Sequence, residues 1–276
     1  DQLQDGWDKL KHYEWSLNPG YLLLSILMAL SYFVFTSWIW HLLLSYLGSE
    51  VGFWKSFRIL QLAQLGKYLP GRVWAIGGQL YLGEREGIPR PTLLWAMGLH
   101  WFFNLLSGAI IFLPFLYVLT PLWAAVSVTL ILMFLLGLGF LPRRILRLLS
   151  GWVDLSDPEK LPSGLLRVSS GQCLSIFFAF VFTWSLFGFA FWSLINTITE
   201  VPLGAYYKVL ASFCGAWVLG VISFFAPGGI GVREGAMVYL LSQFLLPSVA
   251  VIISVAARLW ITLVELVCAA VGWFSQ

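Results

Sequence analysis

The sequence predicts an all-helical protein that crosses a membrane several times. Of its 276 residues, 59% are hydrophobic and only 11% are charged, whereas soluble domains carry about 25% charged residues. Residues 20–49 contain no Asp, Glu, Lys or Arg, and about 20 apolar residues suffice for a helix to cross a bilayer. Transmembrane β-barrels instead show segments of about ten residues that alternate in polarity. The composition therefore excludes soluble enzymes and nucleic-acid-binding proteins, and we expect no nucleic-acid partner.

Long apolar runs predict six membrane-spanning helices in a single domain that covers residues 1–276. The predicted spans are 20–47, 92–119, 121–141, 170–195, 205–226 and 249–273. Two further apolar segments are interrupted: 53–82 at Pro70-Gly71 and 224–247 at Pro227-Gly228-Gly229. Proline removes a backbone donor and glycine admits positive φ, so each interruption predicts two short helices that meet at a turn. In lipid, such turns are tolerated only inside protein or beside a water-filled cavity.

The distribution of basic residues sets the orientation of these helices. Loops on the cytoplasmic side of a membrane carry an excess of Lys and Arg. Loop 142–168 holds five of them and is predicted to be cytoplasmic, which places 83–90 inside and 1–19 outside. Eleven of the sixteen Lys and Arg residues then lie on the cytoplasmic side. We therefore expect a multi-pass protein of the cytoplasmic membrane of a bacterium or archaeon.

In this orientation the interrupted segments predict re-entrant hairpins that enter the membrane from opposite sides. Segment 53–82 dips in from the cytoplasm and 205–246 from the outside. If one helix precedes Asp1, the chain consists of two units in opposite orientation, each with two spans, a re-entrant hairpin and a third span. Inverted repeats of this kind are typical of transporters. The alternative is that 205–226 crosses the membrane completely.

The residues around the second interruption predict an anion-binding turn. The backbone is opened by Pro227, Gly228, Gly229 and Gly231. The helix that resumes near Arg233 directs free N–H groups into this turn, where its dipole also favours an anion. Arg233 and Glu234 add an adjacent cation and carboxylate. The alternative is a packed structural turn whose two charges pair with neighbours.

Arg258 and Glu265 lie in the last span, seven residues apart and thus on one helix face. Ionisable residues at membrane depth are costly and by default suggest function. The alternative is a structural role in salt bridges, Arg258 with Glu234 and Glu265 with Arg233.

Two further sets of polar residues are candidates for the site. In the first hairpin the group consists of Lys67, Tyr68, Pro70, Gly71 and Arg72. Its cations either reach lipid phosphates at the cytoplasmic surface or line the access path of an anionic head group. His100 and Asn104 are four residues apart in span 92–119. They predict a buried pair hydrogen-bonded across helices, with a polar relay of protons as the alternative.

Other chemistry is not indicated. The sequence contains no HExxH, Walker or GxSxG motif and no paired carboxylates at catalytic spacing. Cys173, Cys214 and Cys268 each lie inside an apolar run, which is typical of small buried hydrophobic residues. We therefore expect no metal, no cofactor and no catalytic residue.

Four segments carry a resemblance to a known family. They are LGKYLPGRVW at 65–74, YLGEREGIPR at 81–90, APGGIGVREGA at 226–236 and AARLWITLVE at 256–265. With them the chain resembles, from Trp7 to Phe274, the flippase-like transmembrane domain of lysylphosphatidylglycerol synthases (the MprF type) and the stand-alone YbhN-like membrane proteins. The resemblance implies movement of a lipid between leaflets, in the MprF type an aminoacylated phosphatidylglycerol made by a soluble synthase domain. This sequence ends at Gln276 without such a domain, so transfer of lysine is not expected of it.

The resemblance implies lipid-binding roles for Lys67 to Arg72, for Pro227 to Glu234 and for Arg258. Our leading hypothesis is a transporter that moves an anionic or aminoacylated phospholipid, or a polyprenyl-phosphate-linked lipid. The head group would enter a polar cavity between the two interrupted hairpins, where Arg72, Arg233 and Arg258 neutralise its phosphate. Glu234 and Glu265 are candidate proton carriers for ion-coupled transport.

Other functions stay open at this point. They are an accessory subunit that presents lipid to a separate synthase or glycosyltransferase, an intramembrane enzyme acting on a lipid phosphate, and a small-ion channel. Candidate partners are a membrane phospholipid or lipid carrier, a second copy of the chain in a homodimer, and a lipid-modifying enzyme.

Overall fold

The computed structural model describes residues 17–69, 73–118, 161–162, 164–223 and 231–275. These residues form eight α-helices and no strand. The helices are α2 (Pro19–Tyr46), α3 (Phe53–Gln64), α4 (Val73–Arg85), α5 (Arg90–Phe112), α8 (Ser170–Ile198), α9 (Tyr206–Ile222), α10 (Val232–Leu241) and α11 (Pro247–Phe274). Short 3₁₀ helices join them: η1 (Leu65–Tyr68), η2 (Leu113–Val118), η4 (Leu165–Arg167) and η5 (Leu203–Ala205).

Five of the helical segments are long and apolar enough to cross a membrane. They are Pro19–Tyr46, Arg90–Leu116, Ser170–Ile198, Leu203–Ile222 and Pro247–Phe274. The prediction of an all-helical, multi-pass membrane protein is therefore confirmed, and five of the six predicted spans coincide with helices. The sixth, 121–141, lies outside the described residues, as does most of loop 142–168.

Local capping explains where several of these apolar helices begin. The side chain of Asn18 accepts hydrogen bonds from the N–H groups of Gly20 and Tyr21, and Pro19 occupies the first turn of α2. At the start of α8, the Ser169 hydroxyl and the Gln172 side chain satisfy each other's backbone N–H groups. Such caps supply partners that the first turn of a helix lacks.

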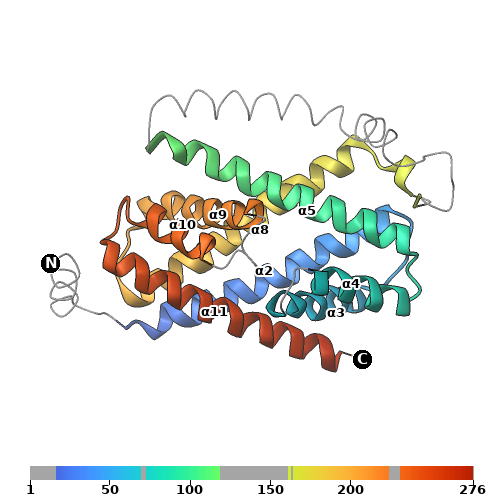
Figure 1. The fold of residues 1–276 in the computed structure, drawn as a ribbon, viewed down its shortest axis with the longest axis horizontal. Helices are drawn as coiled ribbons and strands as arrows, with labels where there is room; N and C mark the ends of the chain where they lie inside the picture. The colour runs from blue at the N-terminus through green and yellow to red at the C-terminus, as the bar shows by residue number, and fades with distance from the viewer. Residues whose placement is uncertain (1–16, 70–72, 119–160, 163, 224–230, 276) are drawn as a thin grey trace.

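Helices α2 and α8 pack along each other through the centre of the molecule, as Figure 1 shows. Large side chains such as Trp40, Trp184 and Phe187 are almost fully buried there. The Gln61 amide ties α3 to this centre, because it donates to the Ser37 hydroxyl at 2.8 Å and to the Phe33 carbonyl at 3.3 Å. The centre is thus a closely packed support for the helices around it.

Two helical hairpins flank this centre. Helix α3 packs against α4, and α9 packs against α10. The hairpins lie at opposite ends of the molecule, and α11 runs along one side and contacts both α3 and α10 (Figure 1). The turns predicted at Pro70-Gly71 and at 227–229 lie outside the described residues. Helix α11 therefore links the two hairpins, and α5 does so as well through its contacts with α4 and α9.

The packing has an internal correspondence. We match α2, α3, α4 and α5 in order with α8, α9, α10 and α11. Each substantial contact between two helices then has a counterpart between the two matching helices. The corresponding contacts are α2–α3 and α8–α9, α3–α4 and α9–α10, α4–α5 and α10–α11, α3–α11 and α9–α5, α5–α8 and α11–α2, and α2–α5 and α8–α11. The contact between α2 and α8 corresponds to itself.

The buried faces of α5 and α11 follow the same correspondence. A shift of 157 positions superimposes nine of the ten buried residues of α5 on buried residues of α11. The pairs are Thr92/Val249, Leu93/Ala250, Ala96/Ile253, Met97/Ser254, His100/Ala257, Phe103/Trp260, Ser107/Val264, Gly108/Glu265 and Phe112/Ala269. The two helices thus present equivalent faces to the protein interior.

Candidate functional site

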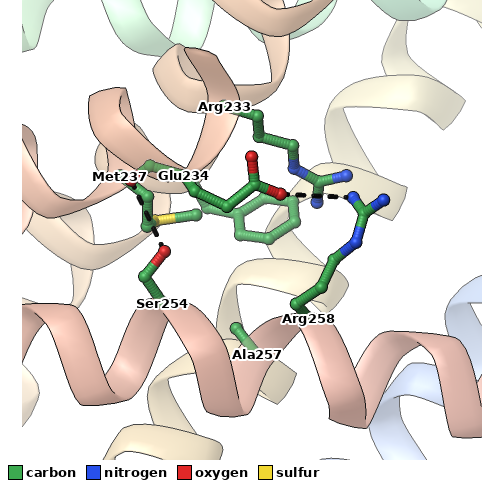
Figure 2. Close-up of a pocket in the computed structure, with 7 residues that line it drawn as sticks. Arg233, Glu234, Met237, Ser254, Ala257 and Arg258 are labelled. Atoms are coloured by element: carbon green, nitrogen blue, oxygen red, sulfur yellow. Dashed lines mark hydrogen bonds and ion pairs between the residues drawn. The ribbon is translucent and has the colours of Figure 1, made fainter. Parts of the chain in front are cut away.

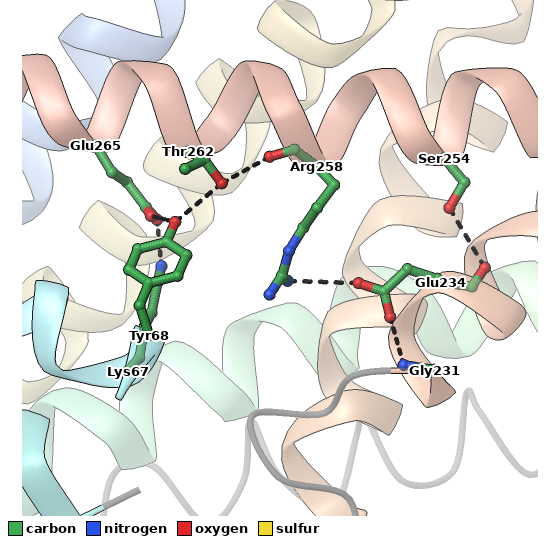
Figure 3. A network of polar contacts seen from close by, with 8 residues as sticks. All are labelled: Lys67, Tyr68, Gly231, Glu234, Ser254, Arg258, Thr262 and Glu265. Carbon is green, nitrogen blue, oxygen red and sulfur yellow. Dashed lines mark hydrogen bonds and ion pairs between the residues drawn. The ribbon is translucent and has the colours of Figure 1, made fainter. Parts of the chain in front are cut away.

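The candidate site is built on a row of polar side chains along one face of α11. Ser254, Arg258, Thr262 and Glu265 are spaced by three or four residues, which places them on one face of the helix. Figure 3 shows this face turned toward η1 of the first hairpin and α10 of the second. The Arg258 side chain extends between the two (Figure 3).

The second hairpin contributes Glu234 from the first turn of α10. One carboxylate oxygen pairs with the Arg258 guanidinium at 3.4 Å. The other accepts a hydrogen bond from the N–H of Gly231 at 2.7 Å, as the third residue of a capping box does. Glu234 therefore caps α10 and holds Arg258 at the same time, and the predicted pairing of Arg258 with Glu234 is confirmed.

Gly231 provides the backbone conformation on which this arrangement depends. Its φ of +86° lies in the left-handed region, which costs residues with a Cβ about 1–2 kcal/mol. We expect Gly231→Ala to lower the melting temperature of the detergent-solubilised protein, measured by intrinsic fluorescence. Gly235→Ala is the matched control, since a Cβ at this helical position meets nothing within 4 Å and helix propensity favours alanine. Equal melting temperatures for the two variants would contradict the role of the left-handed turn.

The first hairpin contributes Lys67 and Tyr68 from η1. The Lys67 ammonium pairs with one carboxylate oxygen of Glu265, and the Tyr68 hydroxyl donates to the other. The Glu265 side chain is only 5% exposed. The Tyr68 hydroxyl also lies 3.0 Å from the Thr262 hydroxyl. Both oxygens of this buried carboxylate are therefore occupied by groups of the protein itself.

The predicted pairing of Glu265 with Arg233 is wrong. The structure pairs Glu265 with Lys67 instead, because η1 brings the tip of the first hairpin against α11. The two residues are separated by 198 positions in the chain.

Arg233 is the cation of the site that lacks a carboxylate partner among the described residues. Its guanidinium carbon lies 5.1 Å from the centre of the Phe213 ring, a cation–π contact. Arg233 lines a small pocket between α9, α10 and α11 together with Phe213, Glu234, Met237, Ser254, Ala257 and Arg258 (Figure 2). Lys67, Arg233 and Arg258 thus outnumber Glu234 and Glu265 by one positive charge.

This pocket is smaller than the cavity that the sequence predicts. It offers about 20 Å³ to the centres of water molecules, which suffices for about one water. It also lies against the second hairpin alone. In the part of the chain that the structure describes, this pocket is therefore a small, partly open one beside the second hairpin, and the head-group cavity between the two hairpins stays a prediction.

His100 and Asn104 lie away from this site, in the packing between α2, α5 and α8. The His100 ring meets Trp40 and Phe180 edge-on, at centroid distances of 5.9 and 5.1 Å. Both residues are buried, as predicted, but the hydrogen bond between helices runs from the Trp184 indole to the backbone carbonyl of Asn104 at 3.2 Å and involves neither predicted side chain. The two side chains therefore do not form the predicted pair.

Apart from His100 and Asn104, the predicted site residues fall into two groups. Lys67, Tyr68, Gly231, Arg233, Glu234, Arg258 and Glu265 are described, and α11 brings them together. Pro70, Gly71, Arg72, Pro227, Gly228 and Gly229 lie outside the described residues. Cys173, Cys214 and Cys268 are buried and free, as predicted.

Five residues of the site were not predicted: Phe213, Met237, Ser254, Ala257 and Thr262. Ser254 and Thr262 lie four positions before and after Arg258, so helical spacing alone could have indicated them. Phe213 had no such signal, because it reaches Arg233 from α9 through tertiary packing.

Fold and site together define a multi-pass α-helical membrane domain with a charged site held between two helical hairpins. The family model of the lysylphosphatidylglycerol synthase TM region matches residues 4–269. The chain therefore belongs to this family, whose name relates the membrane domain to lipid handling, and the resemblance seen in the sequence is confirmed. No curated protein and no solved structure matches the chain.

Proposed function

We propose that this protein moves a phosphate-bearing lipid between the leaflets of a cytoplasmic membrane. The observation that carries the proposal is Arg233, a cation that has no carboxylate partner among the described residues and lies in one pocket with Arg258. A charge in a low-dielectric region is costly unless an opposite charge accompanies it. A lipid phosphate supplies that charge, and guanidinium groups bind phosphate in a bidentate geometry.

The helix lengths support re-entrance of the first hairpin. Helices α3 and α4 have 12 and 13 residues, and at 1.5 Å per residue they extend only about 18 and 20 Å. The hydrocarbon core of a bilayer is about 30 Å thick. In the second hairpin α10 has 10 residues and is short as well, but Leu203–Ile222 is long enough to cross. We therefore propose one fully re-entrant hairpin and a second whose α10 arm reaches only part of the way.

The corresponding contacts of the two units support an inverted repeat. In such proteins, the two units exchange conformations and so expose one site to either side in turn. Here each hairpin is tied to α11 by one ion pair, Lys67–Glu265 or Glu234–Arg258. If one of these ion pairs opens while the other stays formed, the site becomes accessible from one side of the membrane. The phosphate would then meet Arg233 and Arg258 while the acyl chains stay in lipid.

The proposed topology predicts which hairpin ends are accessible from which side. Single cysteines would replace the exposed residues Glu50 and Arg85 at the ends of the first hairpin, and Lys208 and Gln243 at those of the second. The three native cysteines would be replaced by alanine. We expect an impermeant maleimide added to whole cells to label positions 208 and 243 only. Labelling of 50 or 85 from outside would contradict the proposed orientation.

The proposed function is tested in vesicles that contain the purified protein and a trace of fluorescent phosphatidylglycerol. We expect dithionite, which reaches the outer leaflet only, to bleach more than the outer half of the probe, because lipid changes leaflet during the assay. Bleaching equal to that in protein-free vesicles would contradict transport and favour the accessory subunit.

A further inference from the structure

We infer that the site selects a lipid head group with net negative charge and discriminates against one that carries a free amine. The inference rests on the proposed function, since it names the substrate class of the same site. Its basis is that both carboxylates of the site are already occupied by protein groups, whereas Arg233 has no carboxylate partner in the described part of the chain.

A lipid ammonium would need a carboxylate of the site as its partner, and Glu265 is one of the two candidates. Its two oxygens are taken by the Lys67 ammonium and the Tyr68 hydroxyl, and its side chain is almost fully buried. An incoming ammonium would have to displace a tethered ammonium of the same charge. The exchange gains no ion pair and costs the buried contact of Lys67, so Glu265 does not favour binding of an amine.

Glu234 is occupied in a similar way. One of its oxygens pairs with Arg258 and the other accepts from the N–H of Gly231. An ammonium that bound either oxygen would release Arg258 or uncap α10. It would also approach Arg233 and Arg258, two cations that line the same pocket, and like charges at close range in a low dielectric repel strongly.

The charges that disfavour an amine favour a phosphate. It can bind Arg233 without displacing a protein anion, and it brings the negative charge that the excess cation lacks. A head group with a phosphate and no amine, such as phosphatidylglycerol, is therefore the favoured class. An aminoacylated head group adds an ammonium for which the described residues of the site offer no free carboxylate.

We expect the selectivity for phosphatidylglycerol over its lysyl ester to depend on Lys67. We expect wild-type protein in vesicles to exchange fluorescent phosphatidylglycerol at least about tenfold faster than the fluorescent lysyl ester of phosphatidylglycerol, as one charge-assisted contact would give. Lys67→Gln frees Glu265 for the lipid amine, so we expect the ratio of the two rates to fall at least about threefold. Lys55→Gln is the matched control, since Lys55 lies on α3, is 61% exposed and pairs with Glu86. Its ratio should equal that of the wild type.

A further variant guards against misfolding of Lys67→Gln. In Lys67→Gln/Glu265→Gln the buried carboxylate is neutral, so the variant should recover the wild-type ratio. Size-exclusion profiles establish that each variant is folded. A wild-type ratio near one, a faster lysyl ester, or a ratio unchanged in folded Lys67→Gln would overturn the selectivity while transport stands. If neither lipid moves, the proposed function fails, and the relative binding of the two lipids in native mass spectrometry decides the selectivity.

Discussion

Replacement of Arg233 by Gln is expected to slow the exchange of phosphatidylglycerol by about 10- to 100-fold, because a hydrogen bond to a charged group contributes about 1.5–3 kcal/mol. The rate would be measured from the dithionite bleaching of fluorescent lipid in vesicles. Arg233 is the cation of the site without an ion pair in the described residues, so glutamine leaves no carboxylate without its partner. We therefore expect the variant to be abundant and folded.

Two controls separate a binding role of Arg233 from a general effect. Arg233→Lys keeps the charge but loses the bidentate geometry, so its rate should lie between those of the wild type and the glutamine variant. Lys208→Gln removes an exposed cation at the start of α9 and should exchange lipid at the wild-type rate. Full activity of Arg233→Gln would remove this residue from the site.

The second large effect is expected on stability, at the Lys67–Glu265 pair. Removal of one partner of a buried pair typically costs about 3–5 kcal/mol, because the other charge stays buried without compensation. Glu265 is 5% exposed whereas Lys67 is 37% exposed, so loss of Lys67 should be the more damaging change. We expect Lys67→Gln to lower the melting temperature in detergent more than Glu265→Gln does.

The double variant completes this test. In Lys67→Gln/Glu265→Gln both charges are absent, so most of the lost stability should return. The two changes are then strongly non-additive, as direct contacts are in double-mutant cycles. A double variant whose melting temperature falls by the sum of the single effects would show that the pair does not couple the first hairpin to α11.

The long helices could be predicted from the sequence because hydropathy is a local property. About 20 apolar residues in a row predict a membrane span whatever surrounds them, and helices α2, α5, α8 and α11 follow this rule. The sites of helix interruption are local as well. The described helices of both hairpins end or begin next to the predicted interruptions, since proline and glycine act on the backbone where they stand.

The ion pairs could be predicted only in part, because pairing depends on tertiary packing. Arg258 and Glu234 are 24 residues apart, in consecutive helices that pack against each other, and their pairing was predicted. For Glu265 the sequence analysis proposed Arg233, and only the packing of η1 against α11 brings Lys67 to it instead. The water-sized pocket was also unpredictable, since the distance between hairpins is set by side chains distributed over the whole chain.

The correspondence between the two units shows where they differ. At the shift of 157 positions, Arg258 corresponds to Trp101 and Glu265 to Gly108. Trp101 stacks on Trp217 of α9 with ring centroids 6.1 Å apart, and Gly108 lies against Trp184. The first unit therefore has aromatic packing where the second has charge. An exchange of conformations between the units would bring the polar head group to the same α11 residues in both states.

The most direct test of lipid transport at Arg233 compares phosphatidylglycerol exchange by wild-type and Arg233→Gln protein in the same vesicle preparation. Equal protein content per vesicle would be verified by gel densitometry. We predict protein-dependent exchange for the wild type and a rate at least about tenfold lower for the variant, as loss of one charged contact implies. Equal rates for the two proteins, or no exchange by the wild type, would contradict lipid transport at Arg233.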